Sequence, residues 1–119
     1  MEKLTQQEED AMQAIWRTGE GSVKTFMAAL TGATPPYTTL ASTVKNLEKK
    51  GYVQSRLIGN AYLYAPAITE EAYKQKFMGN LVKDYFENSY KELVSFFVEK
   101  NKISTEELKE IIGLIEGKK

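Results

Sequence analysis

The chain has 119 residues, with 16 Lys and Arg against 16 Asp and Glu, and it contains no His and no Cys. These absences exclude disulfides, thiolate or imidazole metal sites, and catalytic dyads built on Cys or His. An apolar fraction of 42% is enough for a small domain with a helical arm. No apolar run approaches the length of about 18 residues that a membrane helix needs.

The groups left for catalysis are carboxylates, hydroxyls and Lys. The clustered acids Glu8, Glu9 and Asp10 are typical of the first turn of a helix. We therefore expect a protein that is not an enzyme and has no metal ion and no cofactor. The charged start at Glu2 and Lys3 does not resemble a signal peptide, so we expect a soluble, cytoplasmic protein without membrane insertion.

The charges are unevenly distributed along the chain. Residues 1–21 and 68–119 have more acids than bases, whereas residues 22–67 contain only one acid, Glu48. The bases of this middle segment are Lys24, Lys45, Lys49, Lys50 and Arg56. Such a basic island is typical of a surface that contacts nucleic-acid phosphates, and a chance cluster on a solvated surface is the alternative.

Two short helices are predicted in the first 32 residues. Thr5 and Glu8 form a capping-box pattern, and apolar residues follow at helical spacing until Gly19. Ser22 can cap a second helix, which Gly32 closes. Both helices then have one apolar face to bury.

A third helix is predicted from about Pro36 to Lys50, followed by Gly51 as a left-handed residue. One face is apolar, while the other carries Thr, Ser, Asn and Lys, which suit base edges and phosphates. The candidate DNA-binding residues of this helix are Tyr37, Thr38, Thr39, Ser42, Thr43, Lys45, Asn46, Lys49 and Lys50. An ordinary solvated helix face is the alternative.

A β-hairpin is predicted next, because two β-prone runs, residues 52–58 and 61–65, flank a Gly-Asn turn. Arg56 on the first run is a further candidate DNA contact. Three helices followed by a hairpin give the order of a helix-turn-helix with a wing. We therefore expect a mainly α fold with a small β-hairpin, in which residues 1–67 form a winged-helix DNA-binding domain.

The remaining residues, 68–119, predict a helical dimerisation domain. Residues 69–100 carry a wide apolar stripe at helical spacing, and Ser104 and Glu107 form a capping box for a last helix that ends at Gly117. A second copy of the chain is the simplest cover for this surface, and an apolar effector is the alternative. The candidate dimer contacts are Tyr73, Phe77, Leu81, Phe86, Leu93, Phe97, Leu108, Ile111, Ile112 and Ile115.

Several stretches together carry a family resemblance. Residues 4–16 end in Ile-Trp, residues 37–52 begin Tyr-Thr-Thr and end Lys-Lys-Gly-Tyr, residues 62–66 read Tyr-Leu-Tyr-Ala-Pro, and residues 93–115 share a helical pattern. In these the chain resembles the penicillinase and methicillin-resistance repressors (BlaI/MecI type), which are winged-helix transcriptional repressors. The resemblance implies a homodimer on a pseudo-palindromic double-stranded DNA operator. It also implies repression of resistance genes, relieved when a membrane sensor-protease pathway leads to cleavage in the dimerisation domain.

Carried over by position, the resemblance assigns base contacts to Thr39 and Ser42 and places Thr38 and Lys49 near the DNA backbone. The chain departs from the family pattern at Asn46, where Arg is common, and this changes the expected operator. Phe96-Phe97 stands where the best-known members have the Asn-Phe pair at which they are cleaved. Without Cys, the thiolate copper sensing of one branch of the family is excluded.

Our interpretation is a homodimeric DNA-binding repressor. If all five cations of the basic island contact phosphates in both subunits, log K falls with log salt concentration with a slope of about −9 per dimer. The alternative, from another functional class, is a winged-helix adaptor that binds a protein and forms no sequence-selective DNA complex.

Overall fold

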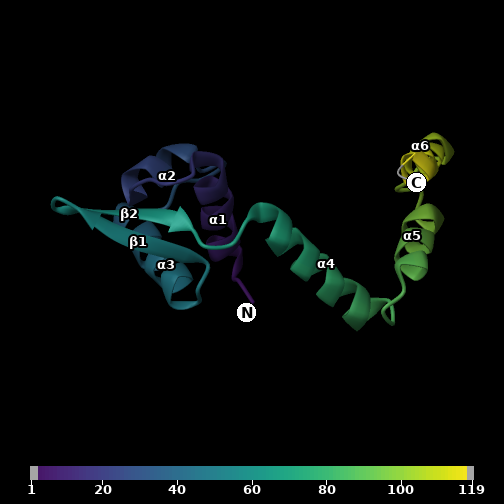
Figure 1. The fold of residues 1–119 in the computed structure, drawn as a ribbon, viewed down its shortest axis with the longest axis horizontal. Helices are drawn as coiled ribbons and strands as arrows, with labels where there is room; N and C mark the ends of the chain where they lie inside the picture. The colour runs from purple at the N-terminus through teal and green to yellow at the C-terminus, as the bar shows by residue number, and fades with distance from the viewer. Residues whose placement is uncertain (1–2, 118–119) are drawn as a thin grey trace. The chain divides into compact units, whose positions relative to one another are not determined.

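The computed structural model describes residues 3–117, with side chains described through residue 113. In this described part the element order is three helices, a two-stranded antiparallel hairpin and three further helices (Figure 1). The chain divides after Tyr73 into two compact units, and each is described by itself. The mainly α fold with a small hairpin is confirmed. Between residues 3 and 117, no helix is long and apolar enough to cross a membrane.

The first two helices begin at the predicted caps. Helix α1 spans Gln6–Thr18, and its capping box is complete: the Glu8 N–H donates to Thr5 Oγ1 at 3.2 Å, and the Thr5 N–H donates to Glu8 Oε1 at 2.8 Å. Helix α2 spans Val23–Ala29, and the Ser22 hydroxyl accepts from a backbone N–H of its first turn. Each cap pairs N–H groups that have no partner inside the helix.

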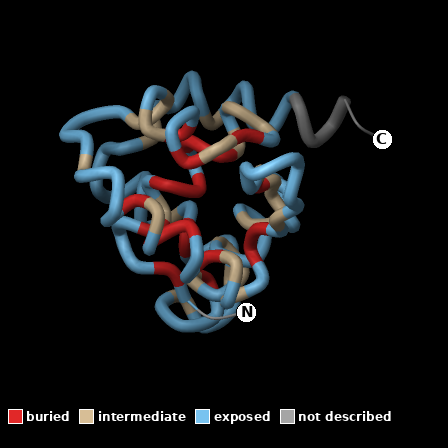
Figure 2. Tube along the Cα trace, turned by 90° about the vertical axis from the view of Figure 1, so that its left-hand side faces the viewer, coloured by how far each residue is buried: buried red, intermediate tan, exposed pale blue. Residues whose placement is uncertain are grey.

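Helix α3 spans Tyr37–Lys49 and buries its predicted apolar face. Gly51 follows with a φ of +86°, the left-handed conformation expected after the helix. Helices α1, α2 and α3 pack with the hairpin around one core, whose buried stretches are red in Figure 2. The core residues are Leu4, Ala11, Met12, Ala14, Ile15, Val23, Phe26, Leu40, Val44, Leu47, Tyr52, Val53 and Tyr64.

The hairpin pairs β1, Val53–Ile58, with β2, Ala61–Pro66, in antiparallel register. Gly59 opens the turn with a φ of +61°, which suits a two-residue hairpin. Gly21, from the α1–α2 connection, forms an isolated antiparallel bridge to Tyr64 on β2. The hairpin is therefore tied to the helices along its β2 side.

An ion pair joins α1 to the end of α3. Lys50 Nζ donates to Glu8 Oε1 at 2.7 Å and to the Lys3 carbonyl at 3.2 Å. Burial raises the pKa of the Glu8 carboxyl, but the bonds from Lys50 and Thr5 and the Lys50 charge outweigh it and hold this pKa below 4.5. Glu8 is thus ionised near neutral pH although it is only 4% exposed.

The second unit contains the rest of α4 (Glu70–Tyr85), α5 (Tyr90–Glu99) and α6 (Thr105–Gly117). The apolar spacing over residues 69–100 is not one continuous helix, because Glu87 and Asn88 take φ values of 52° and 61° between α4 and α5. Ser104 and Glu107 form the predicted box at α6, with both N–H···O distances at 3.1 Å. Of the described residues after Tyr73, the buried apolar ones are Val82 and Leu93.

The Glu8→Gln variant tests the α1–α3 ion pair. Gln can still accept from the Thr5 N–H, so the capping box remains, but the half-buried Lys50 ammonium loses its counter-charge. We expect the free energy of unfolding at pH 7 to fall by about 2 kcal/mol. Urea denaturation at fixed protein concentration measures it.

The same variant has a pH signature. Because folding lowers the Glu8 pKa, the stability that its ionised form contributes is present above 4.5 and is lost as pH falls through the lower folded-state value. Between pH 7 and this window, the difference between the wild type and Glu8→Gln should stay constant, and below it the difference should shrink. A difference that is unchanged down to pH 3 would contradict the role given to the Glu8 charge.

Candidate nucleic-acid interface

Helix α3 presents a continuous polar face opposite its buried side. Leu40, Val44 and Leu47 are at most 2% exposed and hold the helix on the core. The exposed predicted residues of α3 are Tyr37, Thr38, Thr39, Ser42, Lys45, Asn46 and Lys49. Hydroxyl, amide and ammonium groups at this spacing can reach base edges and phosphates along one groove.

The first turn of α3 adds backbone donors to this face. Pro36 occupies the N-cap position and makes no side-chain cap bond. The first N–H groups of the helix are therefore left without a capping side chain, and they lie at the positive end of the helix dipole. Such N–H groups are suited to a phosphate oxygen of the DNA backbone.

The structure corrects the assignment of Thr43 as a DNA contact. Thr43 is only 8% exposed, and its hydroxyl donates to the Thr39 carbonyl at 2.9 Å, one turn back in the same helix. A Thr hydroxyl that bonds the i−4 carbonyl leaves its methyl group to pack inward. Thr43 therefore belongs to the packed side of α3, whereas the neighbouring Ser42 is exposed.

The structure also corrects the role of Lys50. Its ammonium is held between Glu8 and the Lys3 carbonyl, and the Lys50 side chain is 20% exposed. A phosphate contact would remove the counter-charge of the buried Glu8 carboxylate, which is unfavourable. Lys50 fixes the end of α3 in place, and the acid that holds it is 42 positions away in the sequence.

Arg56 also has an acidic partner. Its Nε donates to Glu20 Oε2 at 2.7 Å and its Nη2 to Glu20 Oε1 at 2.5 Å, in an exposed two-point pair. The bond from Arg56 lowers the pKa of Glu20, and the bond from Glu20 raises the pKa of Arg56. One of the guanidinium edges that could bind a phosphate, the one formed by Nε and Nη2, is thus occupied by a carboxylate.

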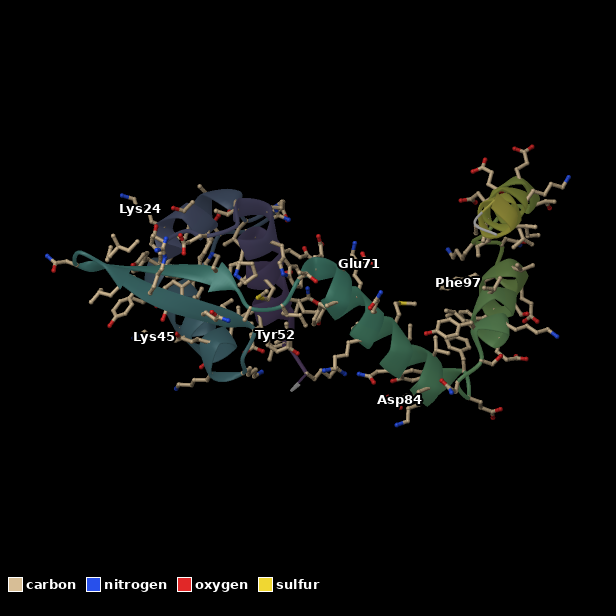
Figure 3. The ribbon with its side chains drawn as sticks, viewed as in Figure 1. Lys24, Lys45, Tyr52, Glu71, Asp84 and Phe97 are labelled. Atoms are coloured by element: carbon tan, nitrogen blue, oxygen red, sulfur yellow. The ribbon has the colours of Figure 1, made fainter. Side chains whose placement is uncertain are left out.

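Three cations of the basic island remain exposed with no ion pair among the described residues. They are Lys24 on α2 and Lys45 and Lys49 on α3, of which Figure 3 labels the first two. The single acid of the segment, Glu48, accepts a hydrogen bond from the Ser55 hydroxyl on β1. The positive charge available to DNA is therefore smaller than the sequence count indicates.

The structure also corrects the assignment of Tyr73 to a dimer interface. Its ring packs at 5.4 Å from Trp16 and 5.9 Å from Tyr52, and its hydroxyl donates to Glu9 at 3.2 Å. Burial, followed by the Glu9 charge and hydrogen bond, raises the pKa of Tyr73 to about 12. Tyr73 therefore joins the first turn of α4 to the winged-helix core.

The other predicted dimer contacts differ in exposure. Leu93 is 7% exposed and lies inside the unit, so it is not available as a surface contact of the single chain. Ile115 lies outside the residues whose side chains are described. The half-buried ones are Leu81, Phe86 and Leu108, and the exposed ones are Phe77, Phe97, Ile111 and Ile112. Tyr85 and Tyr90, which are 76% and 58% exposed, are not among the contacts predicted from the sequence.

Comparisons with known proteins identify one matching family. The family described as penicillinase repressor matches residues 4–117. A search of curated proteins finds no match. A solved structure of Bordetella bronchiseptica BpsR, reported for the mechanism by which 6-hydroxynicotinic acid regulates its DNA binding, is 15% identical with a TM-score of 0.49. That similarity covers 98% of this chain and 76% of the other.

Thr43→Val and Ser42→Ala form a matched pair that tests the inward position of Thr43. Each removes one hydroxyl from adjacent positions, but only the Ser42 hydroxyl faces outward. We expect Thr43→Val to change the free energy of unfolding by less than about 1 kcal/mol and to leave the DNA sequence preference unaltered. Urea titration and a competition assay with a pool of duplexes measure the two quantities. A shift of sequence preference in Thr43→Val would place that hydroxyl on the DNA.

Proposed function

The chain belongs to the penicillinase repressor family, a family of transcriptional regulators rather than enzymes, and from this premise we propose that it is a homodimeric repressor. In the proposal α3 enters the major groove of each half of a pseudo-palindromic operator. The observation that supports it best is the polar face of α3, which is exposed over its whole length while the opposite face is buried.

The chemistry of that face divides into two tasks. Ser42 and Asn46, with Thr39, offer short hydroxyl and amide groups that can read base edges, and an Asn amide pairs well with adenine. Lys45 and Lys49, with Lys24 on α2, offer mobile charges that suit phosphates. Asn46 lacks the guanidinium that reads guanine in many recognition helices, so we expect an operator whose Asn46 contact is adenine.

A second copy is the proposed cover for the apolar surface of α4, α5 and α6. Their described side chains include nine large apolar ones that are at least 37% exposed. They are Phe77, Tyr85, Tyr90, Val94, Phe96, Phe97, Val98, Ile111 and Ile112. Monomeric proteins rarely expose that much apolar surface, and a two-fold dimer also places two α3 helices on the two halves of a palindrome.

The regulated genes and the signal are proposed on the family resemblance. We propose that the operator controls β-lactam resistance genes and that a membrane sensor-protease pathway ends repression by cleavage near Phe96-Phe97. Both residues lie within α5, so the chain there must unfold locally before a protease can bind it in an extended form. Cleavage at this point would separate α6 from the rest of the dimer surface.

Two DNA-binding measurements test the separate roles of the base-reading and phosphate-binding side chains. An operator is first selected from a pool of random duplexes, and binding is then measured on that operator and on random duplex. Asn46→Ala should weaken operator binding by about 1–3 kcal/mol and barely change binding to random DNA. Lys49→Ala should weaken both by the same factor and lower the salt slope by ~0.9 per subunit. Equal losses on both DNAs for the two variants would contradict the roles given to these side chains.

The salt dependence of the wild type separates this proposal from the adaptor alternative. With Lys24, Lys45 and Lys49 on each of two subunits, the slope of log K on log salt should be about −5, rather than about −9 for five cations per subunit. A winged-helix adaptor would give no salt-dependent, sequence-selective complex with DNA.

Phe97→Gln with Ile112→Gln tests the dimer. Replacing two exposed apolar side chains by polar ones should raise the dimer dissociation constant at least about tenfold. Lys91→Gln, at an exposed position on α5, is the control and should leave the dimer intact. Sedimentation velocity over a range of protein concentrations measures the constant. Dimers of unchanged strength in the double variant would exclude this surface as the interface.

A further inference from the structure

The wing has one charged side chain, Arg56, and one edge of its guanidinium is bound to a single partner. Nε and Nη2 both donate to Glu20, at 2.7 Å and 2.5 Å, so that the two carboxylate oxygens each take one N–H. This is the parallel two-point geometry in which a guanidinium also binds a phosphate. Carboxylate and phosphate therefore compete for the same edge of Arg56.

Backbone contacts hold Glu20 beside the wing. The next residue, Gly21, exchanges two hydrogen bonds with Tyr64 on β2, at 2.9 Å and 2.8 Å. A side chain at Gly21 would come within 3.2 Å of Phe26 and Thr18, so this connection packs closely against the helices. Arg56 lies on β1, opposite Leu63 on β2, and reaches Glu20 at the β2 side of the hairpin.

We propose that Glu20 is an internal substitute for a DNA phosphate, which holds Arg56 back from the DNA backbone and so limits sequence-independent binding. The inference rests on the proposed function, since it concerns how that same interface binds DNA. In the wild type the wing then approaches DNA without a free cation. Its tip is otherwise uncharged, with Leu57, Ile58 and Tyr62 between 47% and 57% exposed.

The consequence concerns selectivity. Phosphate contacts strengthen binding to every DNA sequence, and genomes offer a large excess of non-specific sites. A chain that keeps one cation per subunit occupied binds those sites more weakly and depends more on the base contacts of α3. Glu20 is thus a specificity-determining residue that acts through Arg56 and not by touching DNA.

Four variants on a random-sequence duplex about three helical turns long test the proposal. The variants are Glu20→Gln, Arg56→Gln, the double variant, and Glu71→Gln, which removes the same charge from an exposed position on α4. Fluorescence anisotropy between about 50 and 200 mM salt gives the slope of log K on log salt for each. Circular dichroism melting confirms that each variant is folded.

We expect Glu20→Gln to free Arg56 and steepen the slope by ~1.8 per dimer, which increases the loss of affinity between about 50 and 200 mM salt by about 12-fold. Arg56→Gln and Glu71→Gln should keep the wild-type slope, and the double variant should return to it. The last result distinguishes release of Arg56 from a general change of net charge.

Two results would overturn the inference while leaving the proposed function intact. One is a flatter slope in Arg56→Gln, because Arg56 would then already contact phosphate in the wild type. The other is a slope of log K on log salt in Glu20→Gln that equals the wild-type slope, when DNA binding by the wild type does depend on salt. If the wild type forms no salt-dependent complex at all, the proposed function fails and the inference fails with it.

Discussion

The winged helix depends on one buried carboxylate. Glu8 Oε1 accepts both the Thr5 N–H that begins α1 and the ammonium of Lys50 that follows α3. A carboxylate that is 4% exposed is unfavourable unless it is paired and hydrogen-bonded, so the two partners are needed together. Because Lys50 comes directly after α3, this contact fixes the end of the helix that carries the polar face. The buried Leu40, Val44 and Leu47 set which face of α3 points outward, and the ion pair holds the end of the helix against α1.

The acids of the first 21 residues have a role that their sequence position does not reveal. Glu8 and Glu20 pair with Lys50 and Arg56, at separations of 42 and 36 residues. The acidic first segment and the basic island therefore neutralise each other in part when the chain folds. A count of charges along the sequence overestimates the positive potential of the interface, because it cannot identify contacts across such separations. The cations of the basic island that have no ion pair among the described residues lie on α2 and α3.

Local rules predict the elements well, and the errors come where tertiary contacts decide. The caps at Thr5, Ser22 and Ser104 and the Gly59 turn follow from adjacent residues, and the structure confirms them. Thr43 lies at the edge of the polar face of α3, so its spacing in the sequence does not show whether its side chain faces solvent or the core. Its bond to a carbonyl four residues back settles that.

Tyr73 shows the same limit at a larger scale. It shares a row with Phe77 at i+4, so the sequence places both on one surface. The first turn of α4 instead packs on the winged helix, where the Trp16 Nε1–H donates to the Ile68 carbonyl at 2.9 Å and the Trp16 ring meets Tyr73. Periodicity identifies residues that share a face of a helix. It does not show that the first turn of that face packs on one part of the protein and the following turns do not.

The two units differ in how they bury apolar surface, and this couples assembly to DNA binding in the proposed repressor. The winged helix closes a core of its own, whereas the described residues after Tyr73 bury only Val82 and Leu93. In the proposed dimer the stability of that second unit depends on protein concentration, since the second copy would cover its remaining apolar surface. A single winged helix with three free cations has a salt slope of only about −3, and its binding to DNA is correspondingly weak. Joining two of them doubles both the phosphate and the base contacts, so any event that separates the copies removes most of the affinity for the operator.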